Sequence, residues 1–482
     1  MKTGEQWFAD MKKLKATIYN LGKKVEDTTI DPTLRPIIRA AKQTYDINFD
    51  PDFMELATVE SPFIGEMVTR FAHPLLSQAD LVNRVEFNRK WARNFGCCNL
   101  RCQACACINV MYSITYDIDQ RYGTDYHPRF IEFLKYLQKN DLMLSANVMD
   151  VKGNRTLRPS QQADPDLYLR VVERRPDGVV VRGAKAHQTA AAICNENFVI
   201  PCRAMTEDDK DYAIAFTIPT GTPGIIHIMQ HSFQDSRALV AEDIDFGNPE
   251  YASAFSGTSL MIFDDVFVPK ERIFMDGECE FTGTLIRRFG SLARMWEGGC
   301  RPGLIDLLLG ASACITEYNG IEGASHVVDK LSHLALLAET AFSSAMASTM
   351  YPEKSASGIY FPDIRLVSVS KFHTINGMYE ACKLANDLAG ALTMTMPSEK
   401  DYKNPETHEY IEKYLQGKAG VPTEDRIRMF RFIESITSGS DACALHYGGA
   451  TLQPQLFNLW RYTNFDELKK RVKVLSKIEK RE

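Results

Sequence analysis

The segment LYLRVVERRPDGVVVRGAKA, residues 167–186, contains two runs rich in β-branched residues, joined by Pro176-Asp177-Gly178. Turn-forming residues between two such runs predict a β-hairpin. Further strand-like runs follow, and Pro, Gly, Asp or Asn residues separate them. They are NFVIPCRAM (197–205), DYAIAFTIP (211–219), GIIHIMQ (224–230) and SLMIFDDVFVP (259–269). The middle of the chain is therefore predicted to be a β unit.

Helical periodicity flanks this β unit on both sides. Before it, YHPRFIEFLKYLQKNDL (126–142) has helical apolar spacing and a proline near its start. After it, long helices are predicted for residues 301–321, 325–350, 363–390 and 423–447. We expect an α+β chain with a helical domain at 1–142, a β domain at 143–282 and a second helical domain at 283–482. Acyl-CoA dehydrogenases have this order, with a flavin between the β unit and the C-terminal helices, but other multilayered proteins share it.

The composition argues against several classes of protein. The 482 residues are 45% hydrophobic and 24% charged, as in chains that bury a large core. The net charge is −6 and no block of Lys and Arg is present, so we expect no nucleic-acid binding. Asp306 interrupts the longest apolar stretch, and the N-terminus lacks the pattern of a signal peptide. The sequence therefore predicts a protein that does not enter a membrane.

Five of the twelve cysteines lie within CCNLRCQACAC, residues 97–107. A long chain needs no disulfides and adjacent cysteines pair poorly, which favours a reducing, cytoplasmic location. The stretch has helical character, so we expect Cys98, Cys102 and Cys105 on one helix face. Several thiolates on one face suit iron–sulfur or zinc ligation, although free cysteine is also a common buried residue. Cys300, after two glycines, is a candidate remote ligand or a core residue.

Three polar segments are candidate cofactor-binding loops. The segment AKAHQTAA (184–191) places His187, Gln188 and Thr189 at a strand end, where they could hydrogen-bond a flavin ring. The loop at 149–169 carries Gly153 and three cations that could bind phosphates, or it is a charged surface loop. The segment at 385–398 ends a helix and could support a nucleotide. No G-x-G-x-x-G motif follows a strand, which argues against a Rossmann site.

Eight segments match a known family in order along the chain. They are ITYDIDQRYGTDYH (114–127), FLKYLQKNDL (133–142), QADPDLYLRVVE (162–173), GVVVRGAKAHQT (178–189), AMTEDDKDYA (204–213), FDDVFVPKERIF (263–274), ASHVVDKL (324–331) and TMPSE (395–399). With them the chain resembles the 4-hydroxyphenylacetate 3-hydroxylase flavoprotein family and, within it, the 4-hydroxybutyryl-CoA dehydratases, which are also vinylacetyl-CoA isomerases.

The resemblance implies an acyl-CoA dehydrogenase-like fold with a middle β-barrel domain and a C-terminal helical bundle. It also implies a homotetramer, bound FAD and an acyl-CoA substrate. The family's flavin contacts would fall on residues 148–155 and 187–190 and near two helix ends, shared between subunits. The residues concerned are Lys152, Gly153, Asn154, Arg155, His187, Gln188, Thr189, Asn319, Asp387 and Gly390.

The resemblance further implies a 4Fe–4S cluster with Cys98, Cys102 and Cys300 as ligands. In the dehydratases the fourth ligand is a histidine seven residues before the last cysteine, and Ala293 stands there in this chain. The fourth ligand is therefore unknown. Thr189 matches a family active-site threonine.

Other active-site positions depart from the dehydratases. Glu297 and Arg301 replace a tyrosine and a lysine, and Thr258 and Ala444 stand where the dehydratases have acids. Because these groups changed, the substrate need not be 4-hydroxybutyryl-CoA.

Three hypotheses for the function follow. In the first, the three cysteines hold a cluster with one open iron, which acts as a Lewis acid in an elimination or isomerisation of an acyl-CoA. In the second, the cluster is absent or rebuilt with Cys105, and the protein is a flavin-only acyl-CoA oxidoreductase or isomerase. Glu297 is the candidate base in both. The third is a reduced-flavin-dependent phenol monooxygenase, whose histidine ahead of the flavin loop is missing here.

Overall fold

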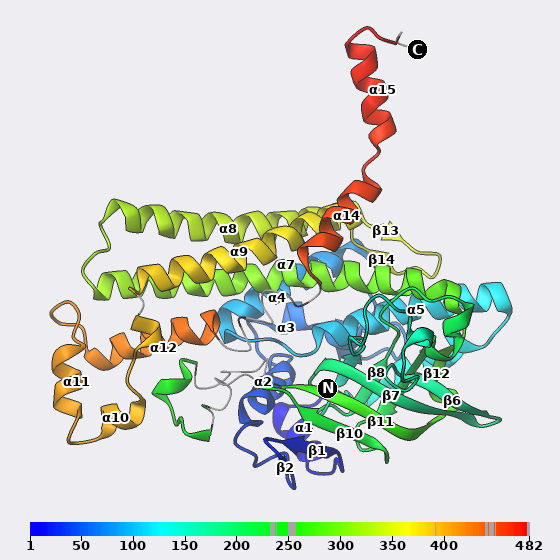
Figure 1. The fold of residues 1–482 in the computed structure, drawn as a ribbon, viewed down its shortest axis with the longest axis horizontal. Helices are drawn as coiled ribbons and strands as arrows, with labels where there is room; N and C mark the ends of the chain where they lie inside the picture. Colours follow the sequence, from blue (N-terminus) through cyan, green and yellow to red (C-terminus); the bar gives the residue numbers. More distant parts are fainter. Residues whose placement is uncertain are drawn as a thin grey trace.

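The computed structural model describes residues 1–231, 237, 239–248, 257–390, 392–438, 442, 448 and 450–479. Its elements follow the expected order of helices, β unit and helices (Figure 1). The long C-terminal helices form one layer, and the β unit and the first helices lie beneath it (Figure 1). The boundaries expected at 142/143 and 282/283 stay a prediction.

Helices dominate the first part of the chain. They are α1 (Gly4–Met11), α2 (Arg35–Asp46), α3 (Met54–Ala57), α4 (Gln78–Phe95), α5 (Cys102–Tyr122) and α6 (Tyr126–Lys139). Ser77 begins α4 with a capping box to Asp80, and Gly96 and Gly123 end α4 and α5 in the left-handed conformation. Helix α6 confirms the helix predicted from 126–142.

Four short strands lie among these helices: β1 (Thr17–Asn20), β2 (Lys23–Lys24), β3 (Thr58–Glu60) and β4 (Met67–Thr69). Strand β1 was not predicted, and it pairs in parallel with a strand of the middle unit, Thr17 beside Ile226. Four residues carry too little periodicity to indicate a strand, and the partner lies more than 200 positions away. The N-terminal region therefore extends the sheet of the β unit.

The middle unit contains two sheets. Its strands are β5 (Leu144–Asn147), β6 (Arg170–Arg175), β7 (Gly178–Thr189), β8 (Glu196–Val199), β9 (Ile214–Pro219), β10 (Ile225–Met229), β11 (Thr258–Pro269) and β12 (Ile273–Asp276). The strand orders are β2-β1-β10-β11-β7-β6 and β12-β9-β8-β5. The predicted hairpin is confirmed, with Arg175 opposite Gly178.

The expected β-barrel is corrected to two open sheets within the described part of the chain. No ladder joins the edge strands of one sheet to those of the other in that part, so neither sheet closes on itself. Strands β7 and β11 instead pair along most of their length, with irregularities near Ser259 and Phe263.

Long helices return after β12. They are α7 (Cys279–Tyr318), α8 (Ser325–Met350), α9 (Ile364–Leu388), α10 (Glu399–Lys403), α11 (His408–Tyr414), α12 (Thr423–Thr437), α14 (Leu452–Tyr462) and α15 (Phe465–Leu475). The short strands β13 (Glu353–Lys354) and β14 (Tyr360–Phe361) join α8 to α9. Helices α14 and α15 form an arm, and α15 stands away from the body (Figure 1).

Helix α7 continues through Gly298, Gly299 and Pro302. A Cβ on Gly299 would lie 2.9 Å from Cβ of Asn88 in α4, and one on Gly298 would collide with Ala345 in α8. These glycines therefore let α7 pack closely against its neighbouring helices. One continuous core joins α4–α6, both sheets and the first half of α7. Among the described helices, none has a stretch both long and apolar enough to cross a bilayer.

Candidate active site

The structure brings Cys98 and Cys102 close to Cys300, but not along one helix face. Helix α5 begins at Cys102, so Cys98 lies in the preceding turn. Leu100 has a φ of +62° there, and its backbone N–H donates to Sγ of Cys98 at 3.3 Å. The side chain of Asn99 accepts the N–H of Cys102 at 3.1 Å. The predicted single helix face was wrong for Cys98 because the chain turns before the helix starts.

Arg301 lies next to these three cysteines. Its Nη1 donates to Sγ of Cys300 at 3.4 Å, and its charge also acts on Cys98 and Cys102. Burial raises the pKa of Cys102 and of Cys300, and Arg301 opposes both shifts. A buried guanidinium thus favours the thiolate form that a metal cluster requires.

The donor set fits a cluster better than a single ion. In the described part of the chain, no three thiol, imidazole or carboxylate groups converge tightly enough to hold one metal ion. Cys98, Cys102 and Cys300 nevertheless form one neighbourhood with a cation beside it, and a cuboidal cluster spreads its ligands farther apart than one ion does. Ala293 is fully buried on α7 and offers no ligand.

Cys105 and Cys107 have different surroundings. The thiol of Cys105 faces the carbonyls of Arg70 and His73, and burial raises its pKa to about 11. Cys107 is buried in the core. These contacts favour a packing role for Cys105.

Glu297 is buried one turn before Arg301 on α7. It forms an ion pair with Lys371 of α9, and its other oxygen lies 3.9 Å from Arg301. The ammonium of Lys371 also donates to the backbone carbonyl of Gly448. Lys371 is completely buried, and this burial lowers its pKa despite the opposing charge of Glu297. The candidate base is therefore held in place from a second helix.

Arg294 adds a third cation to this group, which we call the Glu297 cluster: Arg294, Glu297, Arg301 and Lys371. Burial lowers the pKa of Arg294, and Glu297 opposes that shift. Its Nε is buried without a hydrogen-bond partner in the described structure. Three cations thus surround one carboxylate beside the cysteines, which favours an anionic group at this place.

The two flavin segments of the β unit run side by side. The backbone N–H of Ala186 donates to the carbonyl of Met149 at 2.9 Å, and Nε2 of Gln188 donates to the same carbonyl at 2.8 Å. His187 has a φ of +59°. Burial and the nearby charge of Lys152 lower the pKa of His187. The loop at 148–155 is therefore an irregular extension along the edge of β7.

Most of the predicted flavin residues here face outward. Lys152, Gly153, Asn154, Arg155 and His187 are exposed and Thr189 is half-buried. Gln188 is buried and its amide nitrogen is used within the fold, so its role is to join the two segments.

Thr189 lies directly opposite Thr258 on β11. These two threonines place hydroxyl groups on neighbouring strands where the dehydratases have a threonine and an acid. Ala444 lies outside the described residues.

The other flavin residues lie at the far end of the molecule. Asn319 follows the last turn of α7 and accepts two hydrogen bonds from Arg426. Asp387 forms an ion pair with Lys330, and Gly390 ends α9 with a φ of +66°. Asn319 lies about 28 Å along α7 from Cys300, at 1.5 Å per residue. One chain therefore does not bring both groups of predicted flavin residues together.

Sequence reasoning missed Lys371 and Arg294. Lys371 sits in SVSKFHTING with buried residues at helical spacing, including Val367 and Thr374. A charged residue on the buried face of a predicted helix was an available signal, because such residues are rarely buried without a partner. Arg294 carried no such signal.

The sequence and the fold of this chain match known proteins. Residues 3–275 match the family model described as the N-terminal part of 4-hydroxyphenylacetate 3-hydroxylase, and residues 282–477 match its C-terminal part. The chain belongs to the 4-hydroxyphenylacetate 3-hydroxylase family.

Within the 4-hydroxyphenylacetate 3-hydroxylase family the chain is similar to two dehydratases. It is 38% identical to 4-hydroxybutyryl-CoA dehydratase/vinylacetyl-CoA-Δ-isomerase of Clostridium aminobutyricum, over 99% of this chain and 100% of the relative. The solved structure of an oxygen-tolerant archaeal 4-hydroxybutyryl-CoA dehydratase from N. maritimus superposes with a TM-score of 0.95 at 36% identity, covering 100% of this chain and 96% of that one.

A monooxygenase branch is more distant. The oxygenase component of 4-hydroxyphenylacetate 3-monooxygenase from Geobacillus sp. (strain PA-9) is 27% identical over 92% of this chain and 90% of its own length. A structure of such an oxygenase component with FAD and 4-hydroxyphenylacetate has a TM-score of 0.86 at 24% identity, over 99% of this chain and 98% of that one, which shows a shared fold.

Proposed function

We propose that this protein is a lyase or isomerase of the 4-hydroxybutyryl-CoA dehydratase type that acts on an acyl-CoA thioester with FAD bound. The similarity to two dehydratases along the whole chain supports the reaction class. The observation that carries the proposal is the neighbourhood of Cys98, Cys102 and Cys300 beside Arg301. Ala293, Glu297 and Arg301, which replace other residues of the dehydratases, argue for an acyl chain other than 4-hydroxybutyryl.

The three cysteines would hold a 4Fe–4S cluster. Bound there, the cluster supplies a Lewis acid for a substrate oxygen. Arg301 balances the negative charge of the thiolates, and Ala293 leaves the fourth position without a protein ligand. The missing side-chain ligand at Ala293 supports a fourth iron position that is left to the substrate.

Glu297 is the proposed base, and Lys371 is its positioning residue. The carboxylate would accept a proton from the acyl chain, whose acidity the thioester raises. Lys371 fixes the orientation of Glu297 through their buried ion pair. Thr189, half-buried at the end of β7, would hydrogen-bond the substrate or flavin from the opposite side.

FAD would be bound by residues from two chains. Lys152, Gly153, Asn154, Arg155, His187 and Thr189 would contact it from the β unit of one chain, with Gln188 behind them. Asn319, Asp387 and Gly390 would come from a second copy, because in one chain they lie at the opposite end of α7. Flavin bound there supplies electron transfer during double-bond chemistry.

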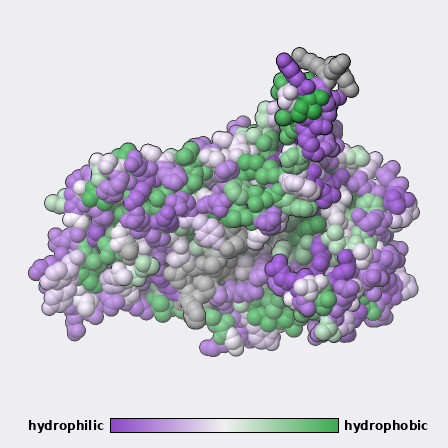
Figure 2. Space-filling model, turned by 45° about the horizontal axis from the view of Figure 1, so that its top comes forward, coloured by the Kyte–Doolittle hydropathy of each residue, from purple (hydrophilic) through white to green (hydrophobic). Residues whose placement is uncertain are grey.

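A homo-oligomer, of tetramer size, is part of this proposal. The arm α14–α15 supports it, since α15 stands away from the body (Figure 1) and buries none of its residues. Helix α15 exposes Phe465, Leu468, Val472 and Leu475 at helical spacing. Figure 2 shows hydrophobic surface on this arm. A helix of 11 residues is marginal in water, so a second copy would stabilise it. We place the enzyme in the cytoplasm because no cysteine in the described part of the chain forms a disulfide, and cysteines ligate best when reduced.

Two alternatives remain weaker. A flavin-only acyl-CoA oxidoreductase or isomerase would use Glu297 in the same way but needs no neighbourhood of three cysteines. A phenol monooxygenase agrees with the fold shared with the FAD-bound oxygenase but not with the three cysteines beside a cation.

Iron, acid-labile sulfide and flavin per subunit test the proposal, in protein purified without oxygen. We expect about four irons, the nuclearity of the cuboidal cluster, together with bound flavin. Cys300→Ser should lower the iron content, whereas the matched variant Cys105→Ser should not. Flavin without iron in the anaerobic protein would favour the flavin-only alternative. Conversion of acyl-CoA esters to enoyl-CoA products by the loaded protein would then identify the acyl chain.

A further inference from the structure

The β unit contains a buried ammonium group whose three hydrogen bonds are all used. Lys185 of β7 is 3% exposed. Its Nζ donates to Oδ1 of Asp150, to the carbonyl of Val148 at 3.2 Å and to the carbonyl of Ile200 at 2.9 Å. An ammonium has three N–H donors, so this arrangement satisfies it completely.

These contacts join the two sheets. Lys185 belongs to the six-stranded sheet, whereas Val148 directly follows β5 and Ile200 directly follows β8 of the four-stranded sheet. The second oxygen of Asp150 accepts the thiol of Cys202 at 3.0 Å. Burial and the Asp150 carboxylate raise the pKa of Cys202 to about 12, so the thiol stays protonated and donates. Both sheet ends and the start of the loop at 148–155 are tied to one side chain.

The same loop presents its other side outward. Tyr168 donates to the carbonyl of Lys152 at 3.0 Å, and Gln162 binds the backbone of Asn154 at both its N–H and its carbonyl. The backbone is thus held from inside at several points, while the side chains of Lys152, Asn154 and Arg155 are exposed. A loop anchored in this way offers its outer polar groups to a ligand with little loss of conformational freedom.

We propose that Lys185 and Asp150 are positioning residues that pre-organise the flavin-binding loop at 148–155. This inference rests on the proposed flavin site and adds residues to it that touch no cofactor. Replacing a buried ion pair by apolar groups often preserves stability, so stability alone does not account for a fully bonded ammonium here. The three oxygen atoms that accept from Lys185 fix the distance between the loop at 148–155 and β7.

The test is FAD binding by the apoprotein, followed by flavin fluorescence. Lys185→Met leaves a buried carboxylate uncompensated and can fail to fold, so the double variant Lys185→Met/Asp150→Asn, which removes both charges, is the main test. We expect it to bind FAD about tenfold more weakly or worse, because the loop must be ordered on binding. The matched control is Arg272→Met/Glu196→Gln, which removes both charges of another ion pair of the β unit, at 2.8 Å and away from the loop.

Hydrogen exchange of the amides at 151–156 in the apoprotein gives a second result that does not depend on flavin. It should become faster in Lys185→Met/Asp150→Asn and stay unchanged in Arg272→Met/Glu196→Gln. The inference is overturned if Lys185→Met/Asp150→Asn binds FAD as tightly as wild type. It is also overturned if hydrogen exchange at 151–156 is unchanged in that variant. A wild-type protein that binds no FAD overturns the proposed function instead, and the exchange result then decides whether Lys185 holds the loop.

Discussion

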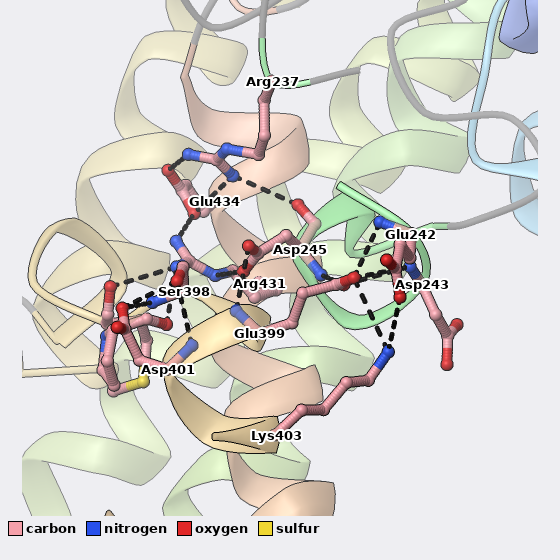
Figure 3. Close-up of polar contacts among 12 residues, drawn as sticks. Arg237, Glu242, Asp243, Asp245, Ser398, Glu399, Asp401, Lys403, Arg431 and Glu434 are labelled. Carbon is pink, nitrogen blue, oxygen red and sulfur yellow. Dashed lines mark hydrogen bonds and ion pairs between the residues drawn. The ribbon is translucent and has the colours of Figure 1, made fainter. Parts of the chain in front are cut away.

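Two groups of buried charges in this molecule look alike in composition but differ in balance. The first, here called the clamp network, consists of Arg237, Asp245, Glu399, Arg431 and Glu434 (Figure 3). The second is the Glu297 cluster. In the clamp network Arg237 and Arg431 pair with Glu434 and Asp245, and backbone N–H groups bind the third carboxylate, Glu399. In the Glu297 cluster three cations face one carboxylate and three cysteines.

The clamp network holds residues 237 and 239–248 against α10 and α12. The carboxylate of Glu399 accepts the N–H groups of Glu242 at 2.7 Å, Asp243 at 3.0 Å and Asp245 at 2.8 Å. Arg431 pairs with Glu434 at 2.6 Å and with Asp245 at 3.0 Å. Such balance is expected of charges that hold segments together, since each unpaired buried group would cost stability. The difference teaches that charge imbalance, rather than charge burial, marks the candidate site.

The largest expected effect is that of Lys371→Met, which leaves Glu297 without its main partner. We expect it to lower the free energy of unfolding by about 3–5 kcal/mol and also to reduce iron content. Urea denaturation and metal analysis measure the two effects. The double variant Lys371→Met/Glu297→Gln should recover much of the stability and lose the activity. Full activity in the double variant would contradict the role given to Glu297.

Arg431→Met should cost about 3 kcal/mol, because it removes two ion pairs and two hydrogen bonds to the carbonyls of Met396 and Pro397. Its effect on the flavin and iron content of the folded fraction should be nil. Loss of iron in Arg431→Met, as expected for Lys371→Met, would contradict the difference drawn between the clamp network and the Glu297 cluster. Urea denaturation and flavin-to-protein ratio provide the measurement.

Acid should loosen the clamp network. Burial raises the pKa of Glu399, but backbone N–H groups more than offset this and leave the pKa below the usual 4.5. Burial also raises the pKa of Glu434, and Arg237 and Arg431 more than offset it in the same way. Their stabilisation is present above pH 4.5 and is lost as the pH falls through the lowered values. Stability measured against pH should therefore fall less steeply in Glu399→Gln than in wild type. The exposed Glu409→Gln is the control and should follow the wild-type curve.

The smallest expected effect is that of Arg294→Met. Because this cation has no carboxylate of its own, its removal should change the unfolding free energy by less than about 1 kcal/mol and can raise it. Arg237→Met, which breaks a pair with Glu434 at 2.6 Å, should cost more. Chemical denaturation of the two variants side by side is the measurement. A loss for Arg294→Met as large as that for Arg237→Met would reveal an anionic partner within the folded chain.

Much of the architecture follows from local sequence. The hairpin at 170–189 is specified by β-branched runs and a two-residue turn, and α6 by its periodicity and proline. Strand β1 and the open sheets could not be predicted, because pairing between distant strands leaves no local pattern. The start of α5 after Cys98 was missed for a similar reason. The left-handed backbone at Leu100 and the hydrogen bond that the side chain of Asn99 accepts from the N–H of Cys102 decide it.

The sequence by itself determined the order of helices and strands, the family, and the residue types that carry the proposed chemistry. These features can be read from periodicity, turn residues and ordered motifs, because each of these signals involves only a few neighbouring positions. Only the tertiary structure decided that Cys300 meets Cys98 and Cys102, that Lys371 holds Glu297, and that Asn319 lies far from Lys152. These relations depend on how α7 packs between α4 and α9, and packing is set by side chains distant in sequence that must share one close-packed core.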